Sequence, residues 1–185
     1  MLMPVTLRRF TVAEIDALPD DGNRYEVLDG VLFVTPGPGL PHQTVAQRLT
    51  VALSVFLAGR PDVGVWSPGV VPIDDASRLE PDVLVGVLPP RWEDWTDVQD
   101  RWLAIEVSGR GSRLYDRTYK RDAYLASGVR EVWLVDLLRH QVSVSRSDGA
   151  PELVCHGSVE WREPGTGRPL RVDLDAIFRG VVGGD

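Results

Sequence analysis

Residues 102–107, with the sequence Trp-Leu-Ala-Ile-Glu-Val, form an almost continuous apolar run. A run of this kind is typical of a strand that is covered on both of its faces. The single charged residue within it, Glu106, then needs a partner, because an unpaired ionised carboxylate in an apolar setting costs several kcal/mol. A buried strand that carries one acid is therefore the feature around which the rest of the chain has to be arranged.

The composition is that of one folded domain. The chain has 185 residues, of which 43% are apolar and 25% are charged, and this length is ordinary for a single domain with its own core. Its apolar runs are far shorter than the roughly 20 residues that cross a bilayer. The basic residues near its start follow the apolar ones, which is the reverse of a secretory signal. We therefore expect a cytoplasmic protein without a membrane span.

Few side chains can bind soft metals, and the charges are unevenly distributed. Cys155 is the only cysteine and there are three histidines, so an internal disulfide and the usual zinc sites are excluded and any metal must be held by oxygen. The net charge of −7 argues against indiscriminate binding to polyanions. Residues 74–100 hold eight acids and two arginines, whereas residues 101–121 hold six bases and two acids. This juxtaposition suits a site for cations and phosphates, although it is also common on solvated faces.

Turn, cap and periodicity signals divide the chain into strands and helices. Thr11 and Glu14 form a capping-box pattern, and Asp29-Gly30 is a dipeptide suited to a tight hairpin turn. In the first half, the predicted elements are a short helix at 11–18, strands at 24–28 and 31–35, a long helix at 45–56, and strands at 63–67, 70–73 and 81–87. In the second half, they are a strand at 102–107, a helix at 113–127, strands at 131–136 and 141–145, short strands from 148 and a final helical turn at 173–178. This pattern predicts one α/β (α+β) domain with a mixed sheet and two long helices.

Two carboxylates emerge from otherwise apolar strands. Because side chains alternate along a strand, Asp82 and Glu106 point away from their apolar neighbours. If their strands are adjacent, the two acids can share one hard divalent ion, since Mg²⁺ binds one or two carboxylates together with waters and phosphate oxygens. The alternative is a buried salt bridge, for example between Glu106 and Arg101, Arg110 or Arg113.

The predicted helix at 113–127 carries Asp116, Lys120 and Tyr124 along one face, at i, i+4 and i+8. An exposed Asp-Lys pair beside a core tyrosine also explains this pattern, and such a pair is worth about 0.3–0.5 kcal/mol. The helix begins just after the strand that ends near Glu106, however, so Lys120 can reach the same crevice. An ammonium group there can hold an attacking water and stabilise a pentacovalent phosphate.

Taken together, these residues resemble the Uma-type putative restriction endonucleases, a family within the PD-(D/E)XK nuclease superfamily. The resemblance covers roughly residues 25–144 and rests on order and spacing. The residues that carry it are Glu26, His42, Pro81-Asp82, Ile105-Glu106-Val107-Ser108, Asp116, Lys120, Tyr124, Gly128 and the strand at 131–136.

The resemblance implies a fold and a set of catalytic residues. The expected fold is a restriction-endonuclease-like mixed β-sheet flanked by two long helices, with extra β-hairpins, in a single domain of residues 1–185. Its nuclease-like core spans about 24–146 and is followed by a β-rich extension at about 147–185. The resemblance further implies that Asp82 and Glu106 bind Mg²⁺ or Mn²⁺ and that Glu26 is a further acid that orients the metal or water. Lys120 would be the base-like or electrostatic residue.

The chain departs from the general superfamily pattern at Ser108, which stands two residues after Glu106 where a lysine is usual. In the Uma-type proteins the usual interpretation places that lysine on the next helix. Lys120 is the only lysine beside 19 arginines. An ordinary surface charge in such an arginine-rich chain would usually be arginine, which is too basic to lose a proton. The presence of lysine at this position therefore favours a functional role.

Several other residues are weaker candidates. His42 follows Pro41 at a helix start, where it has either an active-site role or a role in satisfying loop carbonyls. Glu80 is a possible supporting acid beside Asp82. Arg110, Arg113 and Arg117 are candidates for binding backbone phosphates, or for neutralising the acidic segment before them. Trp92, Trp95 and Trp102 are candidates for a dimer interface.

The leading interpretation is a Mg²⁺-dependent endonuclease that hydrolyses phosphodiester bonds in DNA. A water activated near Lys120 would attack phosphorus, and a 3′ oxygen would leave in line. The expected partners are DNA and a second copy of the chain in a homodimer. One alternative, favoured by the net charge of −7, is a catalytically inactive nuclease-fold module that binds nucleic acid or protein as a dimer. Another is a sugar hydrolase that uses Glu26 and Glu106 as an acid/base pair and works in EDTA.

Overall fold

The computed structural model describes residues 8–109 and 119–182. The chain divides into two compact units. The smaller unit comprises Met1–Gly37 and Val70–Glu80, and the larger unit comprises Pro38–Gly69 and Pro81–Asp185. None of the described helices is long and apolar enough to cross a membrane.

The smaller unit is an antiparallel sheet with one short helix. Its elements are α1 (Val12–Asp16), β1 (Asn23–Leu28), β2 (Val31–Pro36), β4 (Val71–Asp74) and β5 (Ser77–Leu79), and its strand order is β2-β1-β5-β4. The predicted capping box is confirmed, since the Thr11 hydroxyl accepts the Glu14 N–H and the Glu14 carboxylate accepts the Thr11 N–H. The predicted hairpin is confirmed as well. Asp29 and Gly30 adopt φ values of 50° and 75°, as a primed hairpin turn requires.

The larger unit contains a six-stranded mixed sheet in the order β10-β9-β8-β7-β6-β3. Its strands are β3 (Val63–Trp66), β6 (Val83–Val87), β7 (Arg101–Ser108), β8 (Glu131–Asp136), β9 (Gln141–Arg146) and β10 (Leu153–Cys155). The remaining elements are α2 (Leu40–Phe56), the 3-10 helix η1 (Trp95–Asp97), α4 (Arg121–Ala126), the hairpin strands β11 (Ser158–Arg162) and β12 (Pro169–Asp173), and α5 (Leu174–Ile177). Among the described strands of this sheet, the β7–β8 pair alone is parallel, because α4 and the segment before it connect these two strands.

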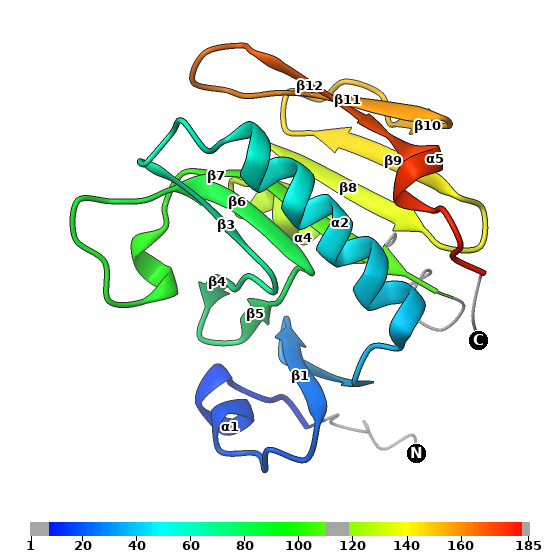
Figure 1. The fold of residues 1–185 in the computed structure, drawn as a ribbon. Helices are drawn as coiled ribbons and strands as arrows, with labels where there is room; N and C mark the ends of the chain where they lie inside the picture. Colours follow the sequence, from blue (N-terminus) through cyan, green and yellow to red (C-terminus); the bar gives the residue numbers. More distant parts are fainter. Residues whose placement is uncertain (1–7, 110–118, 183–185) are drawn as a thin grey trace. The chain divides into compact units, whose positions relative to one another are not determined.

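Helix α2 lies along the sheet of the larger unit and packs against β3, β6, β7 and α5 (Figure 1). Val45, Leu49 and Leu53 recur at helical spacing and are fully buried. They form one core with alternate residues of β7 and with the inner side chains of the β11–β12 hairpin and α5. Every residue of β7 is buried, so the prediction of a strand covered on both faces is confirmed.

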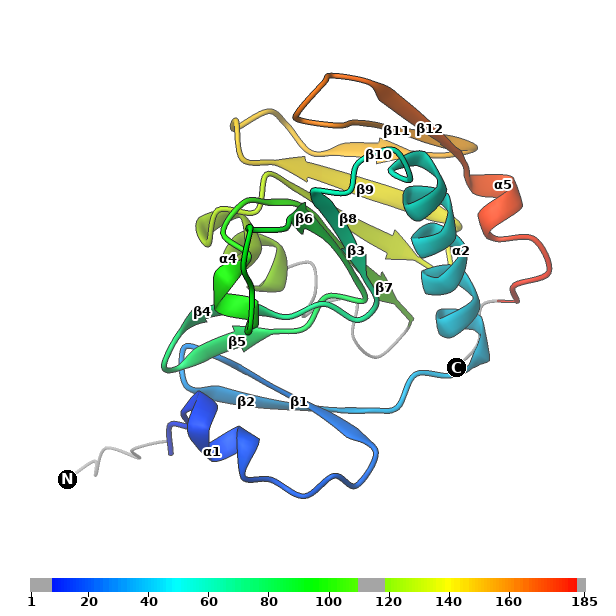
Figure 2. The same cartoon turned by 60° about the vertical axis from the view of Figure 1, so that its left-hand side comes forward.

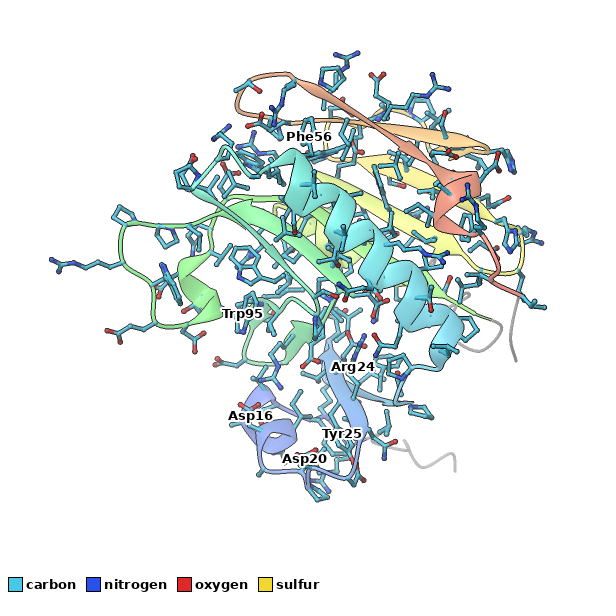
Figure 3. The ribbon with its side chains drawn as sticks, in the orientation of Figure 1. Asp16, Asp20, Arg24, Tyr25, Phe56 and Trp95 are labelled. Atoms are coloured by element: carbon cyan, nitrogen blue, oxygen red, sulfur yellow. The ribbon has the colours of Figure 1, made fainter. Side chains whose placement is uncertain are left out.

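The C-terminal hairpin packs at the end of α2. Figure 3 shows Phe56 at that end of the helix, where its ring centroid lies 6.1 Å from that of Trp161 in an edge-on arrangement. The Arg168 guanidinium lies over the ring of Phe56, 4.0 Å from its centroid. The hairpin is therefore part of the hydrophobic core of the larger unit.

Strand β5 and the burial of Trp102 differ from the sequence-based expectations. The predicted helix at 113–127 lies partly outside the described residues, and its described part consists of a π-type turn at Tyr119-Lys120 followed by α4. Strand β5 is an element that the sequence patterns do not predict. Trp102 is 3% exposed and packs in the core, where a register shift opposite Val85 and Gly86 turns it toward Trp161. Trp102 therefore does not contribute to a dimer interface.

The packing of α2 yields a stability prediction. Replacing Leu53 by Ala removes a fully buried side chain from the core and is expected to lower the free energy of unfolding by about 2–5 kcal/mol. Val51→Ala, at a half-exposed position of the same helix, is expected to change it by less than about 0.5 kcal/mol. Urea unfolding followed by circular dichroism measures both. Equal effects of the two substitutions would show that α2 does not bury the face described here.

Candidate active site

Two acids of the larger unit lie beside one another because their strands are neighbours. Strands β6 and β7 pair antiparallel, with Val83 opposite Ile105. Asp82 and Glu106 each come one residue beyond that pair. Both are only 3% exposed, although the side chains around them are mostly apolar. Each carboxylate therefore depends on specific partners.

Asp82 is held by a backbone group and by a histidine. Its Oδ2 accepts a hydrogen bond of 2.8 Å from the Val107 N–H, so Asp82 is tied to the residue that follows Glu106. The same oxygen lies 3.0 Å from Nε2 of His42. His42 reaches it from the first turn of α2, which begins at Leu40 with Pro41 in its first positions, where proline is favoured.

Glu106 is held by two side chains from one helical turn. Its Oε1 lies 3.2 Å from Lys120 Nζ and accepts a hydrogen bond of 2.5 Å from the Tyr124 hydroxyl. Lys120 is 4% exposed and Tyr124 is fully buried. The two residues are four apart, so they face the same side of their helix, and α4 packs on β8, the parallel neighbour of β7. The sequence-predicted pair Glu106 and Lys120 is thus brought into direct contact.

The two imidazole nitrogens of His42 differ in their surroundings. Nε2 faces Asp82, whereas Nδ1 is buried and has no hydrogen-bond partner within the described chain. Buried polar atoms usually have partners, and an exception often marks a position where a ligand or water binds. His42 therefore belongs to the cluster around Asp82 and does not satisfy loop carbonyls.

The remaining predicted site residues belong to the smaller unit or fall outside the described residues. Glu26 belongs to the smaller unit, where its Oε1 accepts the Glu80 N–H at 2.8 Å. The Glu80 carboxylate lies 3.9 Å from Arg24 Nε, and the Glu80 carbonyl accepts a bond from Arg24 Nη1. The roles of Glu26 and Glu80 stay predictions. The predicted residues outside the described ranges are Arg110, Arg113, Asp116 and Arg117.

Arg101 does not neutralise Glu106. It lies at the opposite end of β7, and its buried Nε has no hydrogen-bond partner among the described residues. Burial lowers the pKa of this guanidinium because it penalises the charged form. Among the described residues, Glu106 is therefore paired with a lysine, and Arg101 plays no part in this pair. The other two arginines considered for it, Arg110 and Arg113, lie outside the described residues.

The donor set fits a small, hard cation. The described residues contain no cluster of three or more His, Cys, Asp or Glu side chains that would form a complete metal cage. Asp82 and Glu106 supply carboxylate oxygens from adjacent strands. Mg²⁺ commonly binds through one or two carboxylates and takes its other ligands from water and substrate phosphates. Two acids with a neighbouring ammonium and imidazole match that requirement.

Sequence reasoning missed one contribution to this cluster and named the residue, but not the contact, of a second. The Val107 N–H fixes Asp82, but a backbone donor has no residue-type signature and can be found only from the strand register. Tyr124 was placed on the right helical face, yet its bond to Glu106 depends on how the helix docks. One cavity among the described residues, of about 230 Å³ and lined by Arg60, Glu163 and Arg168, follows the far end of α2 and lies away from this cluster.

Comparisons with known proteins identify a family and a shared fold. Residues 12–172 match the model of the Uma2 family, described as putative restriction endonucleases. The chain is also similar to the crystal structure of a putative nuclease belonging to DUF820 from Anabaena variabilis, with a TM-score of 0.76 over 94% of this chain and 99% of that chain. At 17% identity, this similarity shows a shared fold. A comparison with curated proteins gives no match. Because the family match spans most of its length, the chain belongs to the Uma2 family of putative restriction endonucleases.

Proposed function

We propose that this protein is a Mg²⁺- or Mn²⁺-dependent endonuclease that hydrolyses phosphodiester bonds in DNA. The observation that carries the proposal is the convergence of Asp82, Glu106 and Lys120 within one buried cluster. A purely structural ion pair would need only one acid and one base. The second acid, with its own histidine partner, adds the oxygen donor that a hard cation requires.

Asp82 and Glu106 would hold the divalent ion. When bound, such an ion polarises a phosphoryl oxygen and lowers the pKa of a coordinated water, which makes hydrolysis accessible at neutral pH. The sequence contains no cysteine cluster or histidine cluster that would favour a softer metal. The same two residues can therefore serve both for folding and for binding the ion.

The surrounding side chains orient the acids and handle protons. The Tyr124 hydroxyl and the Val107 N–H each donate to a carboxylate oxygen, which restricts the rotation of Glu106 and Asp82. Lys120 Nζ lies at the Glu106 carboxylate, where an ammonium can orient a water and stabilise negative charge that develops on a phosphate. A lysine side chain can also take part in proton transfer, whereas an arginine keeps its charge.

The first prediction concerns the two acids. Asp82→Asn and Glu106→Gln keep the side-chain size but remove the negative charge, and each is expected to lower the rate of plasmid nicking in Mg²⁺ or Mn²⁺ at least about 100-fold. The matched control is Glu160→Gln, at an exposed position on β11, which is expected to retain the wild-type rate. Nicking that survives either active-site substitution would remove this mechanism.

A second prediction uses a readout other than activity. An ion that binds only the folded protein stabilises it by about 2.7 kcal/mol at a concentration 100-fold above Kd. Mn²⁺ is therefore expected to raise the Tm of the wild type and of Glu160→Gln, and to have little effect on Asp82→Asn or Glu106→Gln. The inactive nuclease-fold module predicts no Mn²⁺ effect on any of the four proteins, and that outcome would favour it.

The third prediction separates the charge of Lys120 from its acidity. Lys120→Arg keeps a cation next to Glu106, so we expect a Tm close to that of the wild type, whereas loss of the buried cation in Lys120→Met costs about 3–5 kcal/mol. We expect Lys120→Arg to reduce the nicking rate by about 100-fold or more, because guanidinium does not lose a proton. A nicking rate within a few-fold of the wild type would limit Lys120 to an electrostatic role.

A further inference from the structure

One end of the six-stranded sheet is formed by three segments that are distant in sequence. Figures 1 and 2 both place the end of β8, helix α5 and the first half of α2 on the same side of the larger unit. The turn between β8 and β9 follows directly on the parallel β7–β8 pair, in which Ser108 lies opposite Asp136. The Leu137 N–H donates to the Ser108 carbonyl at 3.1 Å. This turn is therefore anchored two residues beyond Glu106.

The three segments are tied together by specific contacts. The ring of His140, in the β8–β9 turn, stacks on Phe178, which follows α5, at a centroid distance of 4.7 Å and an interplanar angle of 8°. Arg48 of α2 donates from Nη1 to the carbonyls of Ile177 and Arg179, at 2.7 and 2.9 Å. The backbone on either side of the stacked rings is thus fixed.

Two arginines flank the stacked rings and point their charge to solvent. Arg139 precedes His140, and Arg179 follows Phe178; both are exposed. The Arg139 side chain makes a single bond within the described chain, from Nη1 to Asp136 Oδ2 at 3.3 Å. The Arg179 side chain makes no hydrogen bond or ion pair with a described residue. Most of their N–H donors are therefore available to a ligand, and guanidinium groups with free donors are well suited to phosphate oxygens.

We propose that Arg139 and Arg179 bind backbone phosphates of the nucleic acid on one side of the cleaved bond. The inference rests on the proposed endonuclease function and adds a binding surface to it. With a rise of about 3.3 Å per strand residue, the β8–β9 turn lies on the order of 10 Å beyond Glu106. This span corresponds to about three nucleotides of one strand, at about 3.4 Å each. A strand that enters the acidic cluster can therefore reach the turn that carries Arg139, where His140 stacks on Phe178, the residue before Arg179.

The net charge of the whole chain opposes binding to a nucleic acid, so the local position of these arginines matters. The net charge of −7 repels a polyanion at long range, and Asp175 lies one helical turn before Arg179. Contacts to phosphates fix the register of a nucleic acid without reading its sequence. We therefore expect these arginines to contribute affinity and salt dependence and to leave any sequence preference unchanged.

Arg130 provides a matched control. Arg130 lies just before β8 and Arg139 lies just after it. The two arginines are therefore at opposite ends of the same strand, about 20 Å apart. Their side chains are 50% and 53% exposed, and each contacts an aspartate. Arg130 differs in that both Nε and Nη2 bond Asp100. Substitution by Ala at either position changes the net charge equally, so a difference reports on the location of each arginine and on how many of its donors are already bonded.

The experiment is a binding measurement that does not depend on cleavage. A fluorescein-labelled DNA duplex, and the single strand of the same sequence, are titrated with Glu106→Gln protein that also carries Arg139→Ala, Arg179→Ala or Arg130→Ala, over a series of salt concentrations. Arg139→Ala and Arg179→Ala are each expected to weaken binding about threefold to tenfold and to reduce the slope of log K against log salt by about 1. Arg130→Ala is expected to change neither quantity. Circular dichroism melting verifies that each variant is folded.

The outcomes separate this inference from the proposed function. If the arginine variants behave like Arg130→Ala while wild-type protein nicks DNA, the phosphate surface lies elsewhere and only this inference is overturned. If the wild type neither binds nor nicks DNA, both proposals are overturned. A loss of affinity without a change in the salt slope would also contradict a phosphate contact.

Discussion

A carboxylate inside a fully buried strand is the constraint on which the larger unit depends. Glu106 cannot be ionised there without a partner, and the partner is a lysine that is itself buried. A buried pair of this kind contributes little net stability, because desolvation offsets attraction, yet losing either member is costly. The folding of β7 is consequently linked to the docking of the segment that carries Lys120 and Tyr124.

Asp82 repeats the same arrangement from the neighbouring strand. It takes a backbone N–H from β7 and faces the imidazole of His42, so the first turn of α2 is bound to the start of β6. Each acid is thus matched by a group from a helix, and the two helices are different ones. The cluster therefore joins the sheet to the structures on its two sides, so the residues proposed for catalysis also contribute to folding.

Much of this could be predicted from the sequence, because local signals dominate where they are strong. The capping box at Thr11, the hairpin at Asp29-Gly30 and the buried strand at 102–107 are encoded within a few residues of one another. Partner choice is different. No local sequence pattern shows whether Arg101 or Lys120 is the partner of Glu106, because that depends on which end of β7 each side chain lies near. Trp102 is a related case: the register shift opposite Val85 and Gly86 determines the face of β7 on which it lies, and such a shift leaves no mark in composition.

The core shared by α2 and the C-terminal hairpin has a consequence for how this chain varies. Trp161, Val172 and Leu174 pack in the same cluster as Leu49 and Leu53, and Arg48 holds the backbone beyond α5. The last forty residues are therefore not an interchangeable appendage to a self-sufficient catalytic module. Insertions and deletions are tolerated only in the connections that leave this shared packing untouched, so recombination at the apparent boundary near residue 147 would leave an exposed apolar face on both fragments.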